Sequence, residues 1–418
     1  MNKSTAAKVP RQHRTICLYF CQEEYVIHIL KADYFRSVLD KVICDHPELF
    51  PPDISLKYEM KDIRVSKRLK IHVRRITING YHYTVRPSFV MPYMTGFTRD
   101  VEKALFLRKS AVPFWALAYC FGRHAMYWYR MEASLGRNNL VGTTIKTEEN
   151  LPVNLAADEK HTWLLGEKVY IAVTAGNGCL LGTEVADSAS QESLTSAYGV
   201  FKKEIENVKP DYKPATVNTD GWDATQKSWK ALFPSIAVIA CFLHVFISIR
   251  DRAKKKFKEL FFSISTMLWD CYKAESKSSF SQRVRRLDEW SLKNKVHPVI
   301  MDKIGGLRRN LPKFSRAYDF PGSHRTSNTI DRLMQRMDRH LFSTQYFHGN
   351  RNSANLSIRA WALIQNFAPF NPITIKQHKD YMCPAEKVNG FRYHDNWLHN
   401  LLISASLGGC RSHPPNPL

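Results

Sequence analysis

The chain has 418 residues, enough for two or three domains with cores that need no disulfide or metal to hold them together. Lys and Arg number 61 against 38 Asp and Glu, so the formal net charge is +23, and the excess is spread along the whole chain. Nine cysteines without a CxxC pair argue against a secreted disulfide framework, and no apolar run is long enough to span a bilayer, so we expect a cytoplasmic protein without a membrane partner.

This positive charge predicts a polyanionic partner. Lys and Arg bind phosphates with an affinity that is independent of nucleotide sequence and sensitive to salt. Together with an aromatic content of 12%, the charge favours nucleic acid. The alternatives are a merely soluble basic protein, or one bound to an anionic membrane.

Residues 1–95 form a basic N-terminal region. Within it, residues 67–78 (KRLKIHVRRITI) alternate apolar and basic side chains with a period of two. That period is typical of a strand, here one with a basic face. At the other end, the Pro-rich sequence CRSHPPNPL predicts a flexible tail to the C-terminal region, residues 346–418.

Residues 96–145 change to a helical period. A helix is expected over residues 98–109, capped by Thr98, and two shorter helices over 113–121 and 123–135, joined at Gly122. Two short helices joined at a glycine, the second basic and aromatic, are typical of a helix-turn-helix.

The side chains of the second short helix that would reach bases or phosphates in a major groove are Arg123, His124, Tyr127, Trp128 and Arg130. The alternative is an ordinary helical bundle with Trp128 in its core.

Residues 146–345 read as an α/β domain. Strand-like runs and amphipathic helices alternate in the order strand, strand, strand, helix, strand, helix, strand, over residues 151–157, 168–175, 179–186, 190–208, 215–218, 223–232 and 236–240. A Gly-Asn-Gly turn separates the second and third strands. This order is that of an RNase H-like core, and a basic, aromatic, all-α insertion follows at about 245–318.

Three acids stand in different elements of this domain. Asp158 follows the first strand, Asp220 follows the fourth, and Asp331 lies on a helix beyond the insertion. Mg²⁺ takes hard oxygen ligands, so carboxylates brought together from separate elements predict a magnesium site. Glu159 beside Asp158 is expected to be a surface charge, and Asp338 is the alternative third acid.

The sequence around these acids resembles a known family. A T-D-G-W step at 219–222, a C-x-x-H signature at 241–244 and the segment T-S-N-x-I-D at 326–331 occur in the order found in DDE transposases of the RNase H-like superfamily. The similarity is to Mutator-like and related bacterial insertion-sequence transposases, and it covers residues from about 150 to 345. One departure is that the third acid, Asp331, is a Glu in most of the family.

The resemblance implies a DNA transposase. Asp158, Asp220 and Asp331 would be catalytic and hold two Mg²⁺ (or Mn²⁺) ions for strand cleavage and strand transfer. The partners would be double-stranded DNA, carrying the terminal inverted repeats or the target, and a second or further copies of the chain, on the bacterial nucleoid. Cys241 and His244 would support the pocket, with metal ligation as the alternative.

Outside the helix-turn-helix, further DNA contacts are expected from Trp222, Lys254, Lys255, Lys256 and Arg325. Two other readings remain open at this point. One is a non-catalytic DNA-binding regulator derived from a transposase, and the other is a nuclease on the same fold.

Overall fold

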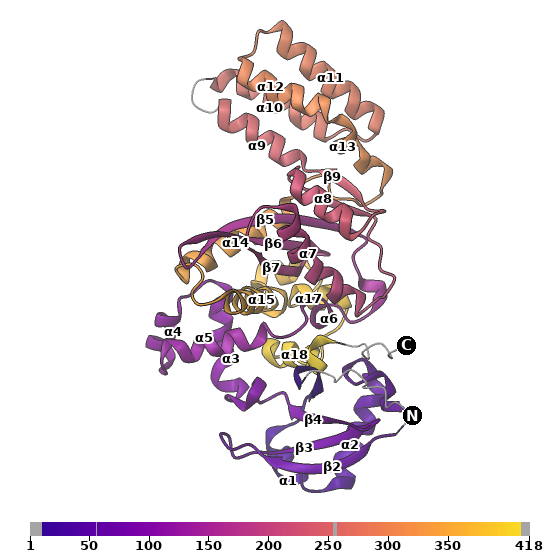
Figure 1. Ribbon diagram of the computed structural model, residues 1–418, viewed down its shortest axis with the longest axis vertical. Coiled ribbons are helices and arrows are strands. Elements are labelled where there is room, and N and C mark those ends of the chain that lie inside the picture. The colour runs from indigo at the N-terminus through magenta and orange to yellow at the C-terminus, as the bar shows by residue number, and fades with distance from the viewer. Residues whose placement is uncertain (1–10, 56, 254–256, 411–418) are drawn as a thin grey trace.

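The structure is a computed structural model, which describes residues 11–55, 57–253 and 257–410. Figure 1 shows an elongated molecule with one sheet near an end, a second sheet in the middle and a helical lobe at the other end. The fold is mixed α/β, with two mixed sheets and many helices, as expected at that level. In the described ranges we find no helix long and apolar enough to cross a membrane.

The N-terminal sheet has the strand order β1-β4-β3-β2, with β1 parallel to β4 and the other pairs antiparallel. Its strands and the helices and 3-10 turns beside them are β1 (Thr15–Leu18), β2 (Glu59–Val65), β3 (His72–Ile78), β4 (Tyr81–Pro87), α1 (Gln22–His28), α2 (Ala32–Asp45), η1 (Arg11–Arg14), η2 (Pro47–Leu49), η3 (Pro52–Ser55) and η4 (Pro92–Met94).

The predicted strand at residues 67–78 is therefore shorter than expected, and its basic face is not free. Arg74 is buried and donates to the Ile29 carbonyl at 2.7 Å. Arg75 is paired with Asp62 on β2, Nε to Oδ1 at 2.7 Å. Both arginines therefore stabilise the N-terminal region instead of facing solvent freely. Their partners, the Ile29 carbonyl and Asp62, belong to other elements, so the sequence of the strand alone does not reveal them.

The three helices predicted between residues 98 and 135 are present as α3 (Thr98–Lys109), α4 (Phe114–Phe121) and α5 (Ala125–Leu135), followed by α6 (Leu140–Thr144). Gly122, between α4 and α5, has φ +70°, a conformation that suits glycine. Thr98 does not cap α3 as predicted. Its hydroxyl is buried and donates to the Ser88 carbonyl at 2.7 Å, and Phe97 holds the capping position.

The second sheet has the order β7-β6-β5-β8-β9, with β7, β6 and β5 antiparallel and β5, β8 and β9 parallel. Its elements are β5 (Asn154–Leu164), β6 (Glu167–Gly176), β7 (Cys179–Ala186), β8 (Thr216–Thr219), β9 (Ala237–Ala240), α7 (Gln191–Glu206) and α8 (Asp223–Leu232). Each agrees with a predicted segment to within a few residues, except β5.

Strand β5 was predicted to end at residue 157, so that Asp158 would follow it. The strand runs on to Leu164, and Asp158 lies in its middle, opposite Val173 of β6. A second two-residue hairpin turn, Leu165-Gly166, closes β5 onto β6 with positive φ at both positions. A leucine in this conformation is unusual, which is why the sequence pattern did not reveal the turn.

Helices cover both faces of this sheet. On one face lie α7 and α8, and on the other α14 (Asn328–Ser343) and α15 (Arg351–Phe367). The core beneath α14 and α15 also contains Trp128 of α5 and Leu401 of α18, so the predicted boundaries at 145 and 345 divide residues that share one core. The remaining C-terminal elements are α16 (Pro372–Gln377), α17 (Pro384–Asn389), α18 (Trp397–Ser404) and η7 (Ser406–Gly409). The short 3-10 turn η5 (Glu148–Asn150) precedes β5.

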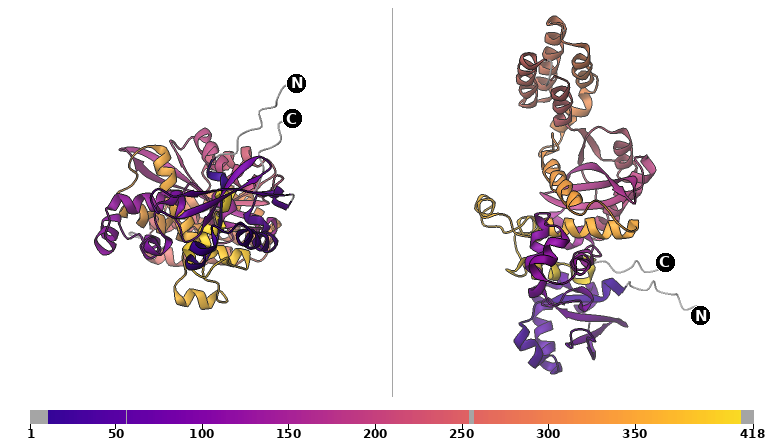
Figure 2. Two further views of the ribbon diagram at one scale, coloured as in Figure 1. Left: turned by 90° about the horizontal axis from the view of Figure 1, so that it is seen from below. Right: turned by 90° about the vertical axis from the view of Figure 1, so that its left-hand side faces the viewer.

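The segment around α16 stands out from the body of the molecule in both views of Figure 2. Of the predicted flexible tail, residues 410–418, all but Cys410 lie outside the described residues.

The predicted all-α insertion forms the helical lobe. It consists of α9 (Phe242–Ala253), α10 (Lys258–Tyr272), α11 (Lys277–Lys293), α12 (Pro298–Arg309), α13 (Leu311–Ser315) and η6 (Arg316–Asp319), with a hydrophobic core of its own. The chain enters and leaves the lobe at adjacent points, since the Phe242 amide donates to the Arg325 carbonyl at 3.1 Å.

Candidate metal centre

Two of the three predicted acids meet at the parallel edge of the second sheet. Strands β5 and β8 are parallel neighbours in which Ala156 pairs with Asn218, so Asp158 and Asp220 come to the same level. With Glu159 they form a group whose carboxylate oxygens lie within 4.8 Å of one another. The register of β5 against β8 thus brings three carboxylates together in one cluster.

Backbone amides hold two of these carboxylates in place. Asp158 Oδ1 accepts from the Glu159 amide at 2.9 Å, and Asp220 Oδ1 accepts from the Trp222 amide at 2.8 Å. The second bond needs a tight turn after β8, and Gly221, with φ +97°, provides it.

Glu159 is the member of the cluster that the sequence reading missed, because it was taken as a surface charge. It is half-buried and faces α7 and α8, where its Oε1 accepts from Tyr198 Oη at 2.7 Å and Thr225 Oγ1 at 2.5 Å. Its Oε2 is buried and has no hydrogen-bond partner among the described residues. The signal was available: once β5 is extended, position 159 shares a face with the buried Leu155 and Ala157.

Burial and mutual repulsion disfavour the charged forms of these acids. Burial, followed by the charge of Asp220, raises the pKa of Asp158 to about 6. Burial likewise raises the pKa of Glu159 to about 7. A divalent cation would remove both penalties, and a set of carboxylate oxygens that includes one buried, unpartnered atom fits Mg²⁺ or Mn²⁺.

Asp331 stands beside the cluster and outside the 4.8 Å group. It lies in the first turn of α14, where its Oδ2 accepts from Ser327 Oγ at 2.9 Å. Its charge is still close enough to raise the pKa of Asp158, after the larger effects of burial and Asp220. The alternative third acid, Asp338, is instead paired with Lys160 at 2.5 Å.

Cys241 connects the sheet to Asp331. Its thiol lies 3.2 Å from Ser327 Oγ and its Sγ accepts from the Ser327 amide at 3.1 Å, while its own amide donates to the Thr219 carbonyl at 2.8 Å. Since Ser327 in turn donates to Asp331, Cys241 helps to position the third acid. A hydrogen bond to Cys241, followed by the nearby acids, raises the pKa of His244 to about 9.

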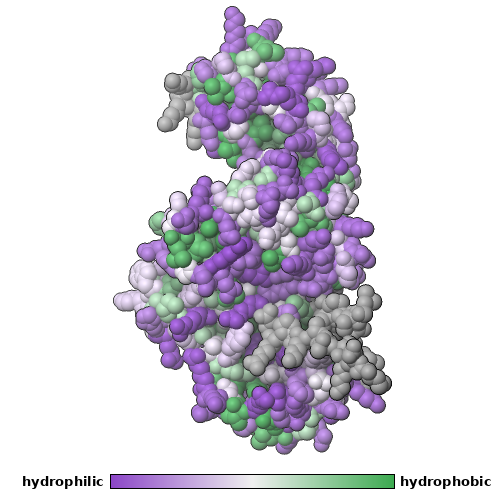
Figure 3. Space-filling view, viewed as in Figure 1, coloured by the Kyte–Doolittle hydropathy of each residue, from purple (hydrophilic) through white to green (hydrophobic). Residues whose placement is uncertain are grey.

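A cavity of about 340 Å³ opens beside Asp220, where the lobe meets the second sheet. Cys241 and His244 line it from one side, and its cationic lining residues are Arg252, Lys303 and Lys313. Figure 3 shows that the surface is hollowed between the lobe and the middle of the molecule. Asp220 therefore faces a basic, open cavity that suits a phosphate-bearing substrate.

The predicted recognition helix is only partly available at the surface. Trp128 is 2% exposed and its Nε1 donates to the Gly122 carbonyl at 3.0 Å, so it belongs to the core and cannot contact DNA. Tyr127 is half-buried, while Arg123, His124 and Arg130 are exposed. The Nδ1 of His124 accepts from the Met126 amide at 3.2 Å, which caps α5.

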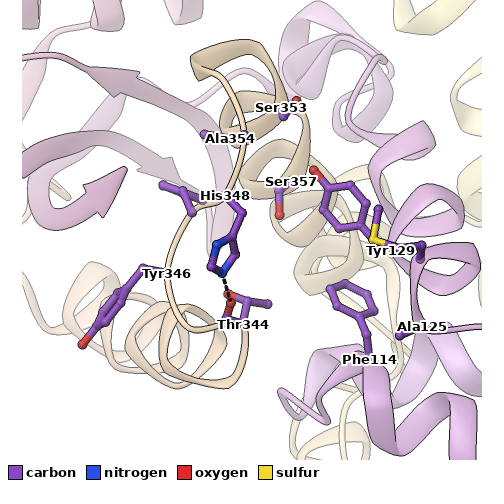
Figure 4. A pocket seen from close by; sticks show the side chains of 12 residues that line it. Phe114, Ala125, Tyr129, Thr344, Tyr346, His348, Ser353, Ala354 and Ser357 are labelled. Atoms are coloured by element: carbon purple, nitrogen blue, oxygen red, sulfur yellow. Dashed lines mark hydrogen bonds between the residues drawn. The ribbon is translucent and has the colours of Figure 1, made fainter. Parts of the chain in front are cut away.

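A second cavity, of about 440 Å³, lies between α4, α5, the start of α15 and the loop after α14. Figure 4 shows Phe114 and Tyr129 on one side and Thr344, Tyr346 and His348 on the other, with His348 Nε2 hydrogen-bonded to the Thr344 carbonyl at 3.0 Å. Its lining is mainly aromatic and apolar, and none of the predicted metal ligands reaches it.

The other predicted DNA contacts are differently placed. Trp222 is half-buried, with its ring 5.8 Å from that of Tyr170. Arg325 is engaged by the lobe, since its guanidinium lies over the rings of Tyr318 and Tyr272 at 4.6 and 4.8 Å. The predicted contacts Lys254, Lys255 and Lys256 lie outside the described residues.

No protein-family model matches the chain, and no curated protein matches it significantly.

Proposed function

We propose that this protein is a DNA transposase with an RNase H-like catalytic core. The observation that carries the proposal is that Asp158 on β5 and Asp220 directly after the adjacent parallel strand β8 meet, with Asp331 beside them on a helix of the same domain. Carboxylates from three separate elements, of which Asp220 lines a basic cavity, suit metal-dependent chemistry on a phosphodiester.

The strand order supports the same reading. Three antiparallel strands followed by two parallel ones, in the order β7-β6-β5-β8-β9, form the sheet expected of an RNase H-like core. One acid lies on its central strand and the next directly follows the adjacent strand. The helix-turn-helix remains part of the proposal with a smaller surface, in which Arg123 and Arg130 would contact DNA without Trp128.

Asp158 and Asp220 would hold Mg²⁺ or Mn²⁺, together with Asp331 and the unpartnered oxygen of Glu159. When bound, the metal would activate water or a 3′-hydroxyl and stabilise the leaving oxygen in an in-line displacement. Ser327 and Cys241 orient Asp331. The cations that line the cavity bind the phosphates on either side of the cleaved bond.

The partners that follow from the proposal are the two ends of a mobile DNA element and a target duplex. Because two ends are handled together, a homodimer or larger assembly on DNA is part of it. The site of action would be the cytoplasm, on the nucleoid.

The test is DNA cleavage by purified protein on a duplex carrying the element's ends, with Mg²⁺. Asp220→Ala should reduce the cleavage rate at least about 1000-fold, because the variant lacks one of the carboxylates that would hold the metal. Asp223→Ala is the matched control, since that exposed acid three residues on is paired with Lys227 at the surface. Cutting that survives in Asp220→Ala would refute the site, and DNA binding without cutting by the wild type would favour the regulator.

A further inference from the structure

A pocket of about 390 Å³ lies beside α14, separate from the metal centre. Asn328, Arg332 and Arg336 of α14 line one side, and Lys387 of α17 and His378 line the other, with the β6–β7 turn at its rim. None of the described residues that line it is acidic. The pocket is thus a concave site walled by cations.

These cations form no ion pair with a carboxylate among the described residues. Within the described part of the chain, none of Arg332, Arg336 and Lys387 has a carboxylate within 4.0 Å, although Lys387 Nζ lies 3.1 Å from His378 Nδ1. Burial, with the neighbouring Arg339 and Arg332, lowers the pKa of Arg336. The arginines at this pocket therefore repel one another, and a bound anion would reduce that repulsion.

A further cation lies close to the pocket. Lys109 donates through Nζ to the Ala368 and Pro369 carbonyls, both at 2.6 Å, and its ammonium lies 5.4 Å from the centre of the Phe370 ring. Burial, followed by Arg336, lowers the pKa of Lys109 to about 8. Lys109 is thus held by carbonyls and forms no ion pair with a carboxylate of the described residues.

Helix α14 places this pocket in a fixed relation to the metal centre. Ile330, Leu333 and Met337 of α14 face the core. Asp331 lies on one flank of that buried stripe, and Arg332 and Arg336, one turn apart with a rise of about 6 Å, lie around the solvent side toward the other. One rigid element thus carries both the third acid and the unpaired arginines.

We propose that this pocket binds a backbone phosphate of the nucleic acid whose cleavage site lies at Asp158 and Asp220. The proposal rests on the proposed function in taking nucleic acid as the polyanion. The planar guanidiniums of Arg332 and Arg336 suit two-point hydrogen bonds to phosphate oxygens. A phosphate held there sets the register of the strand relative to Asp331, because both contacts are built on α14.

The test measures binding without cleavage. A fluorescent DNA duplex is titrated in EDTA at several salt concentrations with wild type, with Arg332→Ala/Arg336→Ala, and with Lys203→Ala/Lys230→Ala. The control pair consists of exposed cations on α7 and α8, across the sheet, and removes the same charge. We expect the arginine variant to bind about tenfold more weakly. The slope of log affinity against log salt should also fall by about 1, and the control should show neither change.

Equal affinity and salt slope in the two variants would overturn the proposal. A second arm titrates inorganic phosphate alone: if the arginine variant loses phosphate binding but keeps full DNA affinity, the pocket serves a free anion and the nucleic-acid assignment is wrong. Because this binding assay contains no metal, it does not depend on cleavage. Wild type that binds DNA in EDTA but fails to cut it in Mg²⁺ would refute the transposase and leave the pocket standing.

A measurement on wild type covers the case in which the arginine variant fails to fold. Phenylglyoxal modifies accessible arginines, and peptide mapping locates the modified side chains. DNA should protect Arg332 and Arg336 from modification, whereas Arg64, an exposed arginine of the N-terminal sheet, serves as the reference for non-specific protection. Modification of Arg332 and Arg336 that DNA leaves unchanged would contradict the proposal.

Discussion

At the level of single residues, Glu159 takes the place in the acid cluster that the sequence had assigned to Asp331. Asp158 and Glu159 are sequence neighbours on a strand, so their side chains leave opposite faces of the sheet. Their carboxylate oxygens nevertheless lie with those of Asp220 within 4.8 Å, at the point where β8 ends. The raised pKa values of these two partly buried acids show that their charged forms are destabilised, and a bound cation would offset that destabilisation.

This penalty predicts how stability depends on pH. Because the folded pKa values of Asp158 and Glu159, about 6 and 7, lie above those of the unfolded chain, the folded state binds more protons between about pH 4 and 7. Their contribution to stability is therefore lost as the pH rises through that window, by roughly 6 kcal/mol in total. In EDTA, Glu159→Gln should have a higher Tm than wild type at pH 8 and a similar Tm at pH 4.

Mg²⁺ at pH 8 should recover most of this loss in wild type and less in Glu159→Gln, as measured by thermal unfolding. Asp223→Asn, which alters an exposed acid, is the control and should follow wild type throughout. A Tm of wild type that does not respond to Mg²⁺ would show that the cluster does not bind the ion.

Ser327 gives a second prediction at this scale. Its hydroxyl is buried, contacts the thiol of Cys241 and donates to Asp331, which it thereby orients. Ser327→Ala should slow DNA cleavage about 10- to 100-fold and raise the Mg²⁺ concentration needed for half-maximal rate, with DNA affinity in EDTA unchanged. Ser327→Thr keeps the hydroxyl and should restore most of the rate.

If Ser327→Ala cut at the wild-type rate with the wild-type Mg²⁺ requirement, Ser327 would not be needed to orient Asp331 for the reaction. The alanine variant should retain the wild-type Tm within a few degrees, which separates a positioning effect from unfolding.

At the level of elements, a buried ion pair fastens α3, α5 and α14 together. Arg108 of α3 donates to Glu132 of α5 at 2.5 Å, and both side chains are almost completely buried. The same guanidinium lies 3.2 Å from Nδ1 of His340 on α14 and 4.0 Å from the Phe114 ring centre. The helices predicted to bind DNA are thus joined to the helix that carries Asp331.

Glu132→Gln should destabilise the protein strongly, because it keeps the shape of the side chain but leaves Arg108 as an uncompensated buried charge. The expected loss is about 3–5 kcal/mol in the unfolding transition that includes α5, measured by urea denaturation. Asp223→Asn, in an exposed pair, should change stability by no more than about 0.5 kcal/mol. An effect of Glu132→Gln as small as that of the exposed pair would mean that water reaches Arg108.

At the level of the whole molecule, the helical lobe is a separate structural unit. Its helices share a core of their own, which includes Phe242, Leu268, Phe280 and Ile304. The chain enters and leaves the lobe where the Phe242 amide is hydrogen-bonded to the Arg325 carbonyl. The lobe is therefore inserted between β9 and α14 while these two elements stay close together. Figure 1 shows it extending from the middle of the molecule.

The lobe should therefore fold by itself. A fragment of residues 242–319 is expected to give a helical far-UV circular dichroism spectrum and a cooperative thermal transition, since its core does not depend on the sheets. A gradual, non-cooperative loss of helicity on heating would show that the sheet domain is needed to order the lobe.

The sequence predicted most of the elements around the second sheet, because the signals for these elements are local. The periodicities of β6, β7, α7 and α8, and the Gly-Asn-Gly turn, are properties of a few consecutive residues. The N-terminal sheet was not foreseen beyond one strand. The parallel pairing of β1 with β4 spans some seventy residues and leaves no local pattern, whereas the Asn79-Gly80 hairpin turn between β3 and β4 is a local signal that the sequence analysis missed. Likewise, neither the helical period of α5 nor its aromatic content shows that Trp128 faces α15.

By itself, then, the sequence determined the charge of the protein, the type and order of the elements around the second sheet, and the acids worth examining. Only the tertiary structure decided that Glu159 joins Asp158 and Asp220, that Trp128 is buried, and that Arg332 and Arg336 share a pocket without an acid. The reason is physical. Periodicity fixes which face of an element is apolar, whereas burial, pairing and electrostatic repulsion depend on which distant element comes to lie against that face.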